Sequence, residues 1–225
     1  MIRPALPTSL LLLALLAAAP PAAADPGPAE TGVRVEKPAG DGVHFSQGSG
    51  VYLGAGLVLT AAHVVKVDPG SPRVTVLLDG RRLDATLVRD GQPDGVDLAL
   101  LRLPAASLGS ARQAQPAVTL CPDNPEPSRP VQVAALGTVR NAFTIPTPLD
   151  SEGPRDTGAW TNILATGFKP GSSGGGVFDP RRSCLWGILA VEMSGPSKTT
   201  GRQLDLTAFV PASRIEPFLA APMAE

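Results

Sequence analysis

Two short segments hold residues whose types and order could support nucleophilic chemistry. Ser173 lies in the glycine-rich stretch Gly171-Ser172-Ser173-Gly174-Gly175-Gly176, where the missing side chains let the backbone come close to a bound substrate. His63 follows the segment Leu59-Thr60-Ala61-Ala62, and an imidazole can accept the proton that a serine hydroxyl loses when it attacks a carbonyl. Together the two segments predict a hydrolytic site with a serine nucleophile.

The order of these residues along the chain excludes one kind of hydrolase. The glycine-rich stretch also fits the G-x-S-x-G elbow of α/β-hydrolases, in which the acid and the histidine follow the serine. Both histidines, His44 and His63, precede Ser173, so the elbow is excluded, and we assign no role to His44. Asp97 is the expected acid because the apolar strand that follows it suits a buried carboxylate, and Asp94 is the alternative.

Short strands must position these residues. Apolar, β-branched segments of about five residues recur between Pro, Gly and Asp turn signals, a pattern typical of strands. The 24 Gly and 25 Pro of the chain also disfavour long helices. Strands are expected over residues 50–53, 56–60, 74–78, 83–88 and 98–103, and then over 131–139, 161–166, 177–178, 185–193 and 204–210. We predict an all-β fold of two six-stranded antiparallel β-barrels, since closure removes exposed strand edges.

The chain divides into five expected parts. Arg3, the apolar run 10–19 and Ala22-Ala23-Ala24 predict a signal peptide over 1–24, and a buried N-terminal helix is the alternative that the surrounding prolines disfavour. A flexible lead-in over 25–42, an N-terminal barrel over 43–104 and a Pro-rich linker over 105–128 should follow. The C-terminal barrel should span 129–225, with a short closing helix over 213–219 that Ser213 caps. We expect a periplasmic or extracellular protein.

Net charge and cysteine content exclude several classes of binding partner and favour a disulfide. With 19 Lys and Arg against 20 Asp and Glu, the chain has no basic excess for binding nucleic acid or an anionic membrane, and no membrane association is expected after signal cleavage. The even cysteine number and an oxidising compartment favour a disulfide between Cys121 and Cys184, with two separate buried thiols as the alternative. The cysteines and histidines lack ligand spacing, so neither a metal site nor a cofactor is expected.

The order His63, Asp97, Ser173 resembles that of the two-barrel chymotrypsin-like (trypsin-like) serine proteases, and the segments around these residues are most similar to the bacterial HtrA-like branch. The resemblance covers roughly residues 43–219. It implies that Ser173 attacks the substrate carbonyl, that His63 moves the proton and that Asp97 orients the imidazole. It also implies that the backbone N–H groups of Gly171 and Ser173 bind the oxyanion, and that substrates are proteins or peptides.

Some positions depart from the family pattern. Ser172 stands where digestive relatives have an aspartate that pairs with a new N-terminus, so activation by that pairing is not expected, nor is the C-terminal PDZ domain of HtrA-like chains. Gly167 replaces the aspartate that selects Arg or Lys in trypsin-like enzymes, which favours a small or medium apolar P1 side chain. Glu192 could narrow the pocket, receive a basic group or be a solvated charge. The resemblance gives as substrate-binding candidates Gly167, Lys169, Ala190, Val191 and Glu192.

The sequence therefore predicts an exported serine endopeptidase that forms an acyl-enzyme at Ser173. A catalytically silent peptide-binding module on the same fold is the main alternative. An esterase is a third possibility, because the same acyl-enzyme chemistry hydrolyses activated esters.

Overall fold

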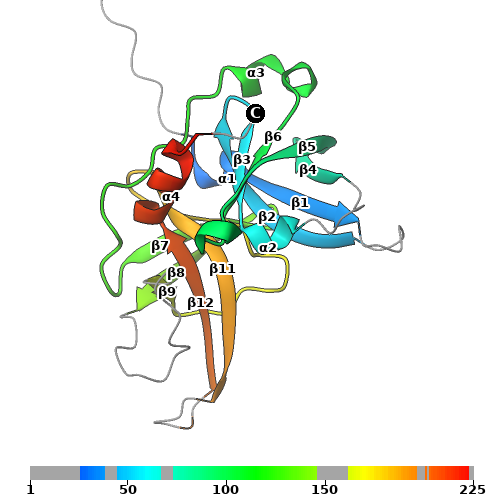
Figure 1. Ribbon diagram of the computed structural model, residues 1–225. Coiled ribbons are helices and arrows are strands. Elements are labelled where there is room, and N and C mark those ends of the chain that lie inside the picture. The colour runs from blue at the N-terminus through cyan, green and yellow to red at the C-terminus, as the bar shows by residue number, and fades with distance from the viewer. Residues whose placement is uncertain are drawn as a thin grey trace, which may run out of the picture.

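The computed structural model describes residues 26–38, 45–66, 73–145, 162–196, 201 and 203–222. Over these residues the chain forms two closed six-stranded antiparallel β-barrels and a short C-terminal helix (Figure 1). The fold class predicted from the sequence is confirmed. The predicted signal peptide over 1–24 and His44 lie outside the described residues.

The N-terminal barrel has the strand order β1-β2-β3-β6-β5-β4. Apolar residues alternate along its strands, as in β4, where the first, third and fifth residues are buried and the others partly exposed. The short helix α1 precedes these strands, α2 lies between β3 and β4, and η1 lies between β5 and β6. The elements are α1 Pro28–Thr31, β1 Gly32–Pro38, β2 Phe45–Gly54, β3 Leu57–Thr60, α2 Ala62–Val65, β4 Val74–Leu78, β5 Arg81–Asp90, η1 Gln92–Asp94 and β6 Ala99–Arg102.

The lead-in expected over 25–42 contains two of these elements, α1 and β1, which corrects the expected start of the barrel at residue 43. Strand β1 pairs with both β2 and β4 and so closes the barrel. Val33 and Val35 are buried in its interior, while charged residues alternate with them along the strand. The high charge of the segment favoured a mobile lead-in, but only every second residue needs to be apolar in a strand with one buried face.

The C-terminal barrel has the strand order β10-β11-β12-β9-β8-β7. Helices η2 and α3 lie on the connection from the first barrel, and α4 follows the last strand. The elements are η2 Ala105–Ser107, α3 Ser110–Gln113, β7 Pro130–Ala135, β8 Thr138–Ile145, β9 Asn162–Leu164, β10 Gly176–Phe178, β11 Leu185–Pro196, β12 Gln203–Pro211 and α4 Ala212–Ala220.

The single strand expected over 131–139 is instead a hairpin of β7 and β8. The turn residues Leu136 and Gly137 both have positive φ, 53° and 73°, as the two central residues of a type I′ turn require. A leucine rarely adopts this conformation, so the local pattern indicated a strand where the chain turns. The closing helix differs as well, because its N-cap is Pro211, without a side-chain hydrogen bond, and not Ser213.

Three apolar clusters hold the molecule together. One fills each barrel, and the third, the interbarrel cluster, contains residues of both barrels and of α4. The buried members of the interbarrel cluster are Val51, Leu53, Leu59, Leu98, Leu100, Ala134, Phe178, Leu185, Ile188, Ala190, Val210, Ile215 and Phe218.

The described residues include no helix that is long and apolar enough to cross a membrane.

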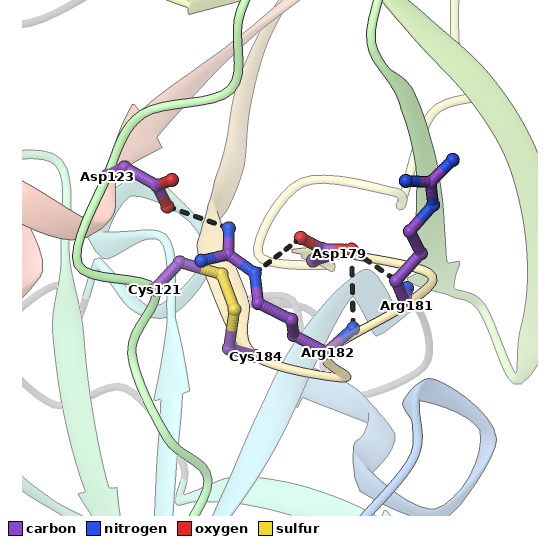
Figure 2. The surroundings of a disulfide bond; sticks show 6 residues. All are labelled: Cys121, Asp123, Asp179, Arg181, Arg182 and Cys184. Carbon is purple, nitrogen blue, oxygen red and sulfur yellow. Dashed lines mark hydrogen bonds and ion pairs between the residues drawn. A yellow bond between two sulfur atoms is a disulfide. The ribbon is translucent and has the colours of Figure 1, made fainter.

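A disulfide joins Cys121, on the connection between the barrels, to Cys184 in the turn between β10 and β11, with 5.1 Å between the Cα atoms. Figure 2 shows Arg182 beside it, paired with Asp123 and with Asp179 at 2.8 Å each. The disulfide expected from the cysteine count is therefore present. It fastens the connecting segment to the chain that follows Ser173.

Candidate active site

His63 and Asp97 meet at one edge of the N-terminal barrel. His63 lies in α2, directly after β3, and Asp97 precedes β6, which pairs with β3. The Asp97 carboxylate accepts two hydrogen bonds from His63, one from its backbone N–H at 2.9 Å and one from Nδ1 at 2.7 Å. The imidazole is 42% exposed and the carboxylate 16%, so the pair faces solvent on the histidine side.

This contact determines the protonation pattern of the imidazole. An ionised carboxylate can only accept hydrogen bonds, so Nδ1 of His63 must carry the proton. In the neutral ring Nε2 is then free to accept a proton. A histidine held in this way can act as a general base towards a hydroxyl on its Nε2 side.

The turn before β6 places Asp97 and not Asp94. Gly91 N–H donates to the Leu98 carbonyl and Val96 N–H to the Gly91 carbonyl, which closes the loop in front of the strand. A Cβ at residue 91 would lie 2.6 Å from the Val96 oxygen, so the closure requires glycine. Asp94, the alternative acid, is exposed in η1, and the structure pairs His63 with Asp97.

Ser173 belongs to the C-terminal barrel but lies against the N-terminal one. Its carbonyl accepts the Ser49 N–H from β2 at 2.7 Å. Gly174 has φ 87°, and a Cβ there would lie 2.0 Å from the Ser49 carbonyl oxygen and 2.3 Å from Thr60 Oγ1. The serine loop therefore contacts the end of β3, three residues before His63, and only glycine permits this approach.

The Ser173 hydroxyl donates a hydrogen bond to the Ala190 carbonyl at 3.4 Å. Within the described part of the chain, no hydrogen bond joins it to His63. A bond of 3.4 Å is long and weak, and rotation of the serine side chain about χ1 breaks it without moving the backbone. The hydroxyl is thus only loosely held in its present direction.

The turn before Ser173 exposes backbone donors. Ser172 N–H donates to the Lys169 carbonyl at 3.0 Å, Pro170 follows Lys169, and Gly171 has φ 91°, which are the features of a type II turn. Among the described residues, neither Gly171 N–H nor Ser173 N–H donates to a backbone or side-chain acceptor. Two unused donors beside a serine hydroxyl could bind an oxygen that carries negative charge.

A small cavity of about 40 Å³ lies next to Ser173. Of the pocket residues expected from the sequence, Lys169, Ala190 and Glu192 line it, while Gly167 and Val191 do not. A Cβ at Gly167 would nevertheless lie 3.0 Å from Glu192 Oε1, so this glycine leaves room for the carboxylate. The full lining is Phe168, Lys169, Pro170, Ser172, Ser173, Leu189, Ala190, Glu192 and Thr207.

Sequence reasoning missed Thr207 in this lining. Thr207 lies opposite Glu192 in the pairing of β11 with β12, is 3% exposed, and donates its hydroxyl to the Thr166 carbonyl at 2.9 Å. The register of the two strands brings it to the cavity, and no local signal in the sequence gives that register. No group of three or more metal-ligating side chains occurs among the described residues.

Comparison with known proteins gives both a family and a fold. The family profile described as a trypsin-like peptidase domain matches residues 48–188. Among solved structures, the active form of the Rv3671c protease from M. tuberculosis has a TM-score of 0.57 at 18% identity, covering 86% of this chain and 81% of that one. The serine protease of human pathogenic astrovirus has a TM-score of 0.53 at 17% identity, covering 84% and 93%. No curated protein sequence matches significantly.

Proposed function

This chain belongs to the trypsin-like peptidase family, whose members are serine endopeptidases, and from that membership we propose a specific catalytic apparatus for it. Ser173 is the nucleophile, His63 is the general base and then the general acid, and Asp97 orients the imidazole. The observation that carries the proposal is the double hydrogen bond from His63 to the Asp97 carboxylate. A carboxylate that is merely solvated would not hold both the backbone and the ring of one histidine.

The proposed reaction has two stages. Ser173 Oγ forms a bond to the substrate carbonyl carbon, and its proton passes to His63 Nε2. The oxyanion so formed accepts hydrogen bonds from Gly171 and Ser173 N–H, and collapse breaks the C–N bond as His63 returns the proton to the departing amine. Water then attacks the acyl-enzyme by the same route, which releases the acid product and restores Ser173.

The small cavity beside Ser173 supports a preference for a small apolar side chain at P1. Its volume of about 40 Å³ leaves little space for an extended side chain, and the Glu192 carboxylate lies at its wall. Digestion of a peptide library should give cleavage mainly after residues such as Ala and Val. Cleavage mainly after Arg or Lys would instead show that Glu192 receives a basic group.

Export is the second part of the proposal. The disulfide between Cys121 and Cys184 is suited to an oxidising compartment, and the sequence of residues 1–24 has the features of a signal peptide. The exported protein should begin at Asp25 when its N-terminus is sequenced.

A catalytically silent peptide-binding module remains the second candidate, and one observation favours it. The Ser173 hydroxyl bonds the Ala190 carbonyl and not His63. The glycine-dependent turn and the His63–Asp97 contact favour the enzyme, because a module that only binds peptides needs neither a tautomer-fixing carboxylate nor free oxyanion donors.

Labelling with a fluorophosphonate separates the two candidates. The wild-type protein should be labelled and should cleave casein, and Ser173→Ala should lose both properties. Ser213→Ala is the control, since it removes an exposed serine hydroxyl in α4 and should still be labelled. Peptide binding by wild-type protein with neither labelling nor cleavage would establish the silent module.

A further inference from the structure

Ser49 on β2 makes four polar contacts around the serine loop. It is fully buried. Its hydroxyl donates to the Gly171 carbonyl and accepts from Leu136 N–H, each at 2.9 Å. Its backbone N–H donates to the Ser173 carbonyl at 2.7 Å, and its carbonyl accepts the Thr60 hydroxyl at 2.6 Å. One residue of the N-terminal barrel thus binds the turn, the loop and a hairpin of the C-terminal barrel.

Two of these contacts hold the residues that carry the free N–H groups. Within the described residues, the backbone N–H groups of Gly171 and Ser173 have no acceptor, and the carbonyl of each residue is bound by Ser49. Gly171, with φ 91°, has the widest conformational freedom of any residue type. Without an external restraint on its carbonyl, the direction of its N–H relative to that of Ser173 would be poorly fixed.

The hydroxyl of Ser49 also binds Leu136, whose side chain packs against Gly171. Leu136, at the tip of the β7–β8 hairpin, has φ 53°, a conformation that is costly for a leucine. Its Cδ2 lies 3.1 Å from where a Cβ on Gly171 would be, so the leucine side chain packs directly on the turn. The bond from Leu136 N–H to Ser49 keeps this strained tip in place.

We propose that Ser49 is a positioning residue for the oxyanion site. Its hydroxyl fixes the Gly171 donor, and its backbone N–H holds Ser173, before the substrate arrives. This inference rests on the proposed function. Donors that are already oriented stabilise charge as it develops in the transition state without further rearrangement. Ser49 touches neither the substrate nor the reacting atoms, so its removal should slow the chemical step and leave ground-state binding unchanged.

The kinetics of fluorophosphonate labelling test whether Ser49 affects the chemical step, and they do so without knowledge of the natural substrate. The Ser173 oxygen bonds to phosphorus as its proton passes to His63 Nε2 and fluoride leaves, and negative charge develops on the phosphoryl oxygen that occupies the oxyanion position. Saturation kinetics separate the rate constant at saturation, kinact, from the half-saturation concentration, KI. For Ser49→Ala we expect kinact to fall about 10- to 100-fold, less than the cost of deleting an oxyanion donor outright, while KI stays within about twofold.

Thr144→Val is the matched control. Thr144 Oγ1 is also a buried hydroxyl: it donates to the Glu126 carbonyl at 2.6 Å and more weakly to the Arg129 carbonyl at 3.4 Å, and it accepts the Arg129 N–H at 2.9 Å. It lies on β8, and its hydrogen-bond partners are outside the serine loop. Removal of its hydroxyl should lower the melting temperature to a similar extent and leave kinact unchanged. If Ser49→Ala is too unstable to purify, Ser49→Cys replaces the hydroxyl by a weaker donor and should lower kinact in the same direction.

The outcomes separate the inference from the proposed function. A wild-type kinact for folded Ser49→Ala, or an equal fall in kinact for Thr144→Val, would overturn the positioning role while the enzyme assignment stands. A rise in KI alone would overturn it too, since it would place Ser49 in ground-state binding. A wild-type protein that the fluorophosphonate does not label would remove the proposed function, and with it this inference.

Discussion

The Asp97 carboxylate sets both the position and the tautomer of His63. One oxygen fixes the backbone at the start of α2, and the other fixes the ring of His63. The histidine is therefore held in one place and in the tautomer with the proton on Nδ1. A substitution that keeps the shape of Asp97 but changes its hydrogen-bonding pattern should spare the fold and damage the chemistry.

Asp97→Asn tests this expectation. The asparagine amide can present N–H groups to Nδ1, which favours the wrong imidazole tautomer, so for the proposed triad we expect kcat to fall about 10⁴-fold. The measurement is casein or peptide hydrolysis, with the melting temperature as the check on folding. Asp94→Asn, which alters the exposed carboxylate in η1, should retain wild-type activity. Equal losses for the two variants would remove Asp97 from its assigned role.

At the scale of elements, the residues of the candidate site lie in turns, and the strands on either side fix the position of those turns. The turn between β10 and β11 is organised by Asp179, whose side chain is 2% exposed. It accepts the N–H of Arg181 at 2.8 Å and Arg182 Nε at 2.8 Å. The same turn carries Cys184, so this carboxylate stabilises the anchor of the disulfide (Figure 2).

Asp179 should make the free energy of unfolding depend on pH. Burial raises the pKa of this carboxyl, but the hydrogen bonds from Arg181 and Arg182 outweigh burial and lower it below the ordinary value of 3.8. The folded protein then binds the proton less readily than the unfolded chain. The stabilisation is therefore complete above the unfolded pKa and is lost as the pH falls through the lower, folded pKa.

Asp179→Asn should accordingly cost about 1 to 3 kcal/mol of unfolding free energy at pH 7, and the gap to wild type should close as the pH falls below 3.8. Urea unfolding at pH 7 and at acidic pH measures both values. Asp123→Asn is the matched control, because Asp123 binds the same Arg182 but is 58% exposed; it should change stability little. A gap that stays constant with pH would contradict the titration.

The elements also show where sequence reasoning succeeds. Strand β4 has the expected bounds, Val74–Leu78, because a short run of β-branched and apolar residues lies between two clear turn signals. The β7–β8 hairpin was missed because Leu136 occupies a turn position that usually selects Gly or Asn. The packing of Leu136 against Gly171 compensates for that local mismatch, and such packing has no signature in a linear pattern.

On the scale of the whole molecule, the interbarrel cluster brings the two halves of the site together. Helix α4 takes part from the C-terminal end: Phe218 packs in this cluster, and the Arg89 guanidinium of β5 lies over its ring at 5.4 Å. Arg89 also donates to the carbonyls of Phe218 and Ala221. The last helix of the chain is therefore fastened to the first barrel.

Phe218→Ala should destabilise the protein by about 3 to 5 kcal/mol, as expected when a buried aromatic side chain is truncated. Phe143→Ala makes the same change at a side chain that is 56% exposed and should alter stability by no more than about 0.5 kcal/mol. Denaturant unfolding of the two variants gives the comparison. Similar stabilities would show that α4 does not contribute to holding the barrels.

The sequence by itself determined the all-β class, the two-barrel fold and the family, because residue type and order carry that information locally. The same holds for the chain order of His63, Asp97 and Ser173, whose catalytic roles stay proposals. Only the tertiary structure decided which contacts those residues make. The place of β1 in the barrel, the lining by Thr207 and the contacts of Ser49 depend on strand register and barrel packing, and both arise from contacts between residues far apart in the chain.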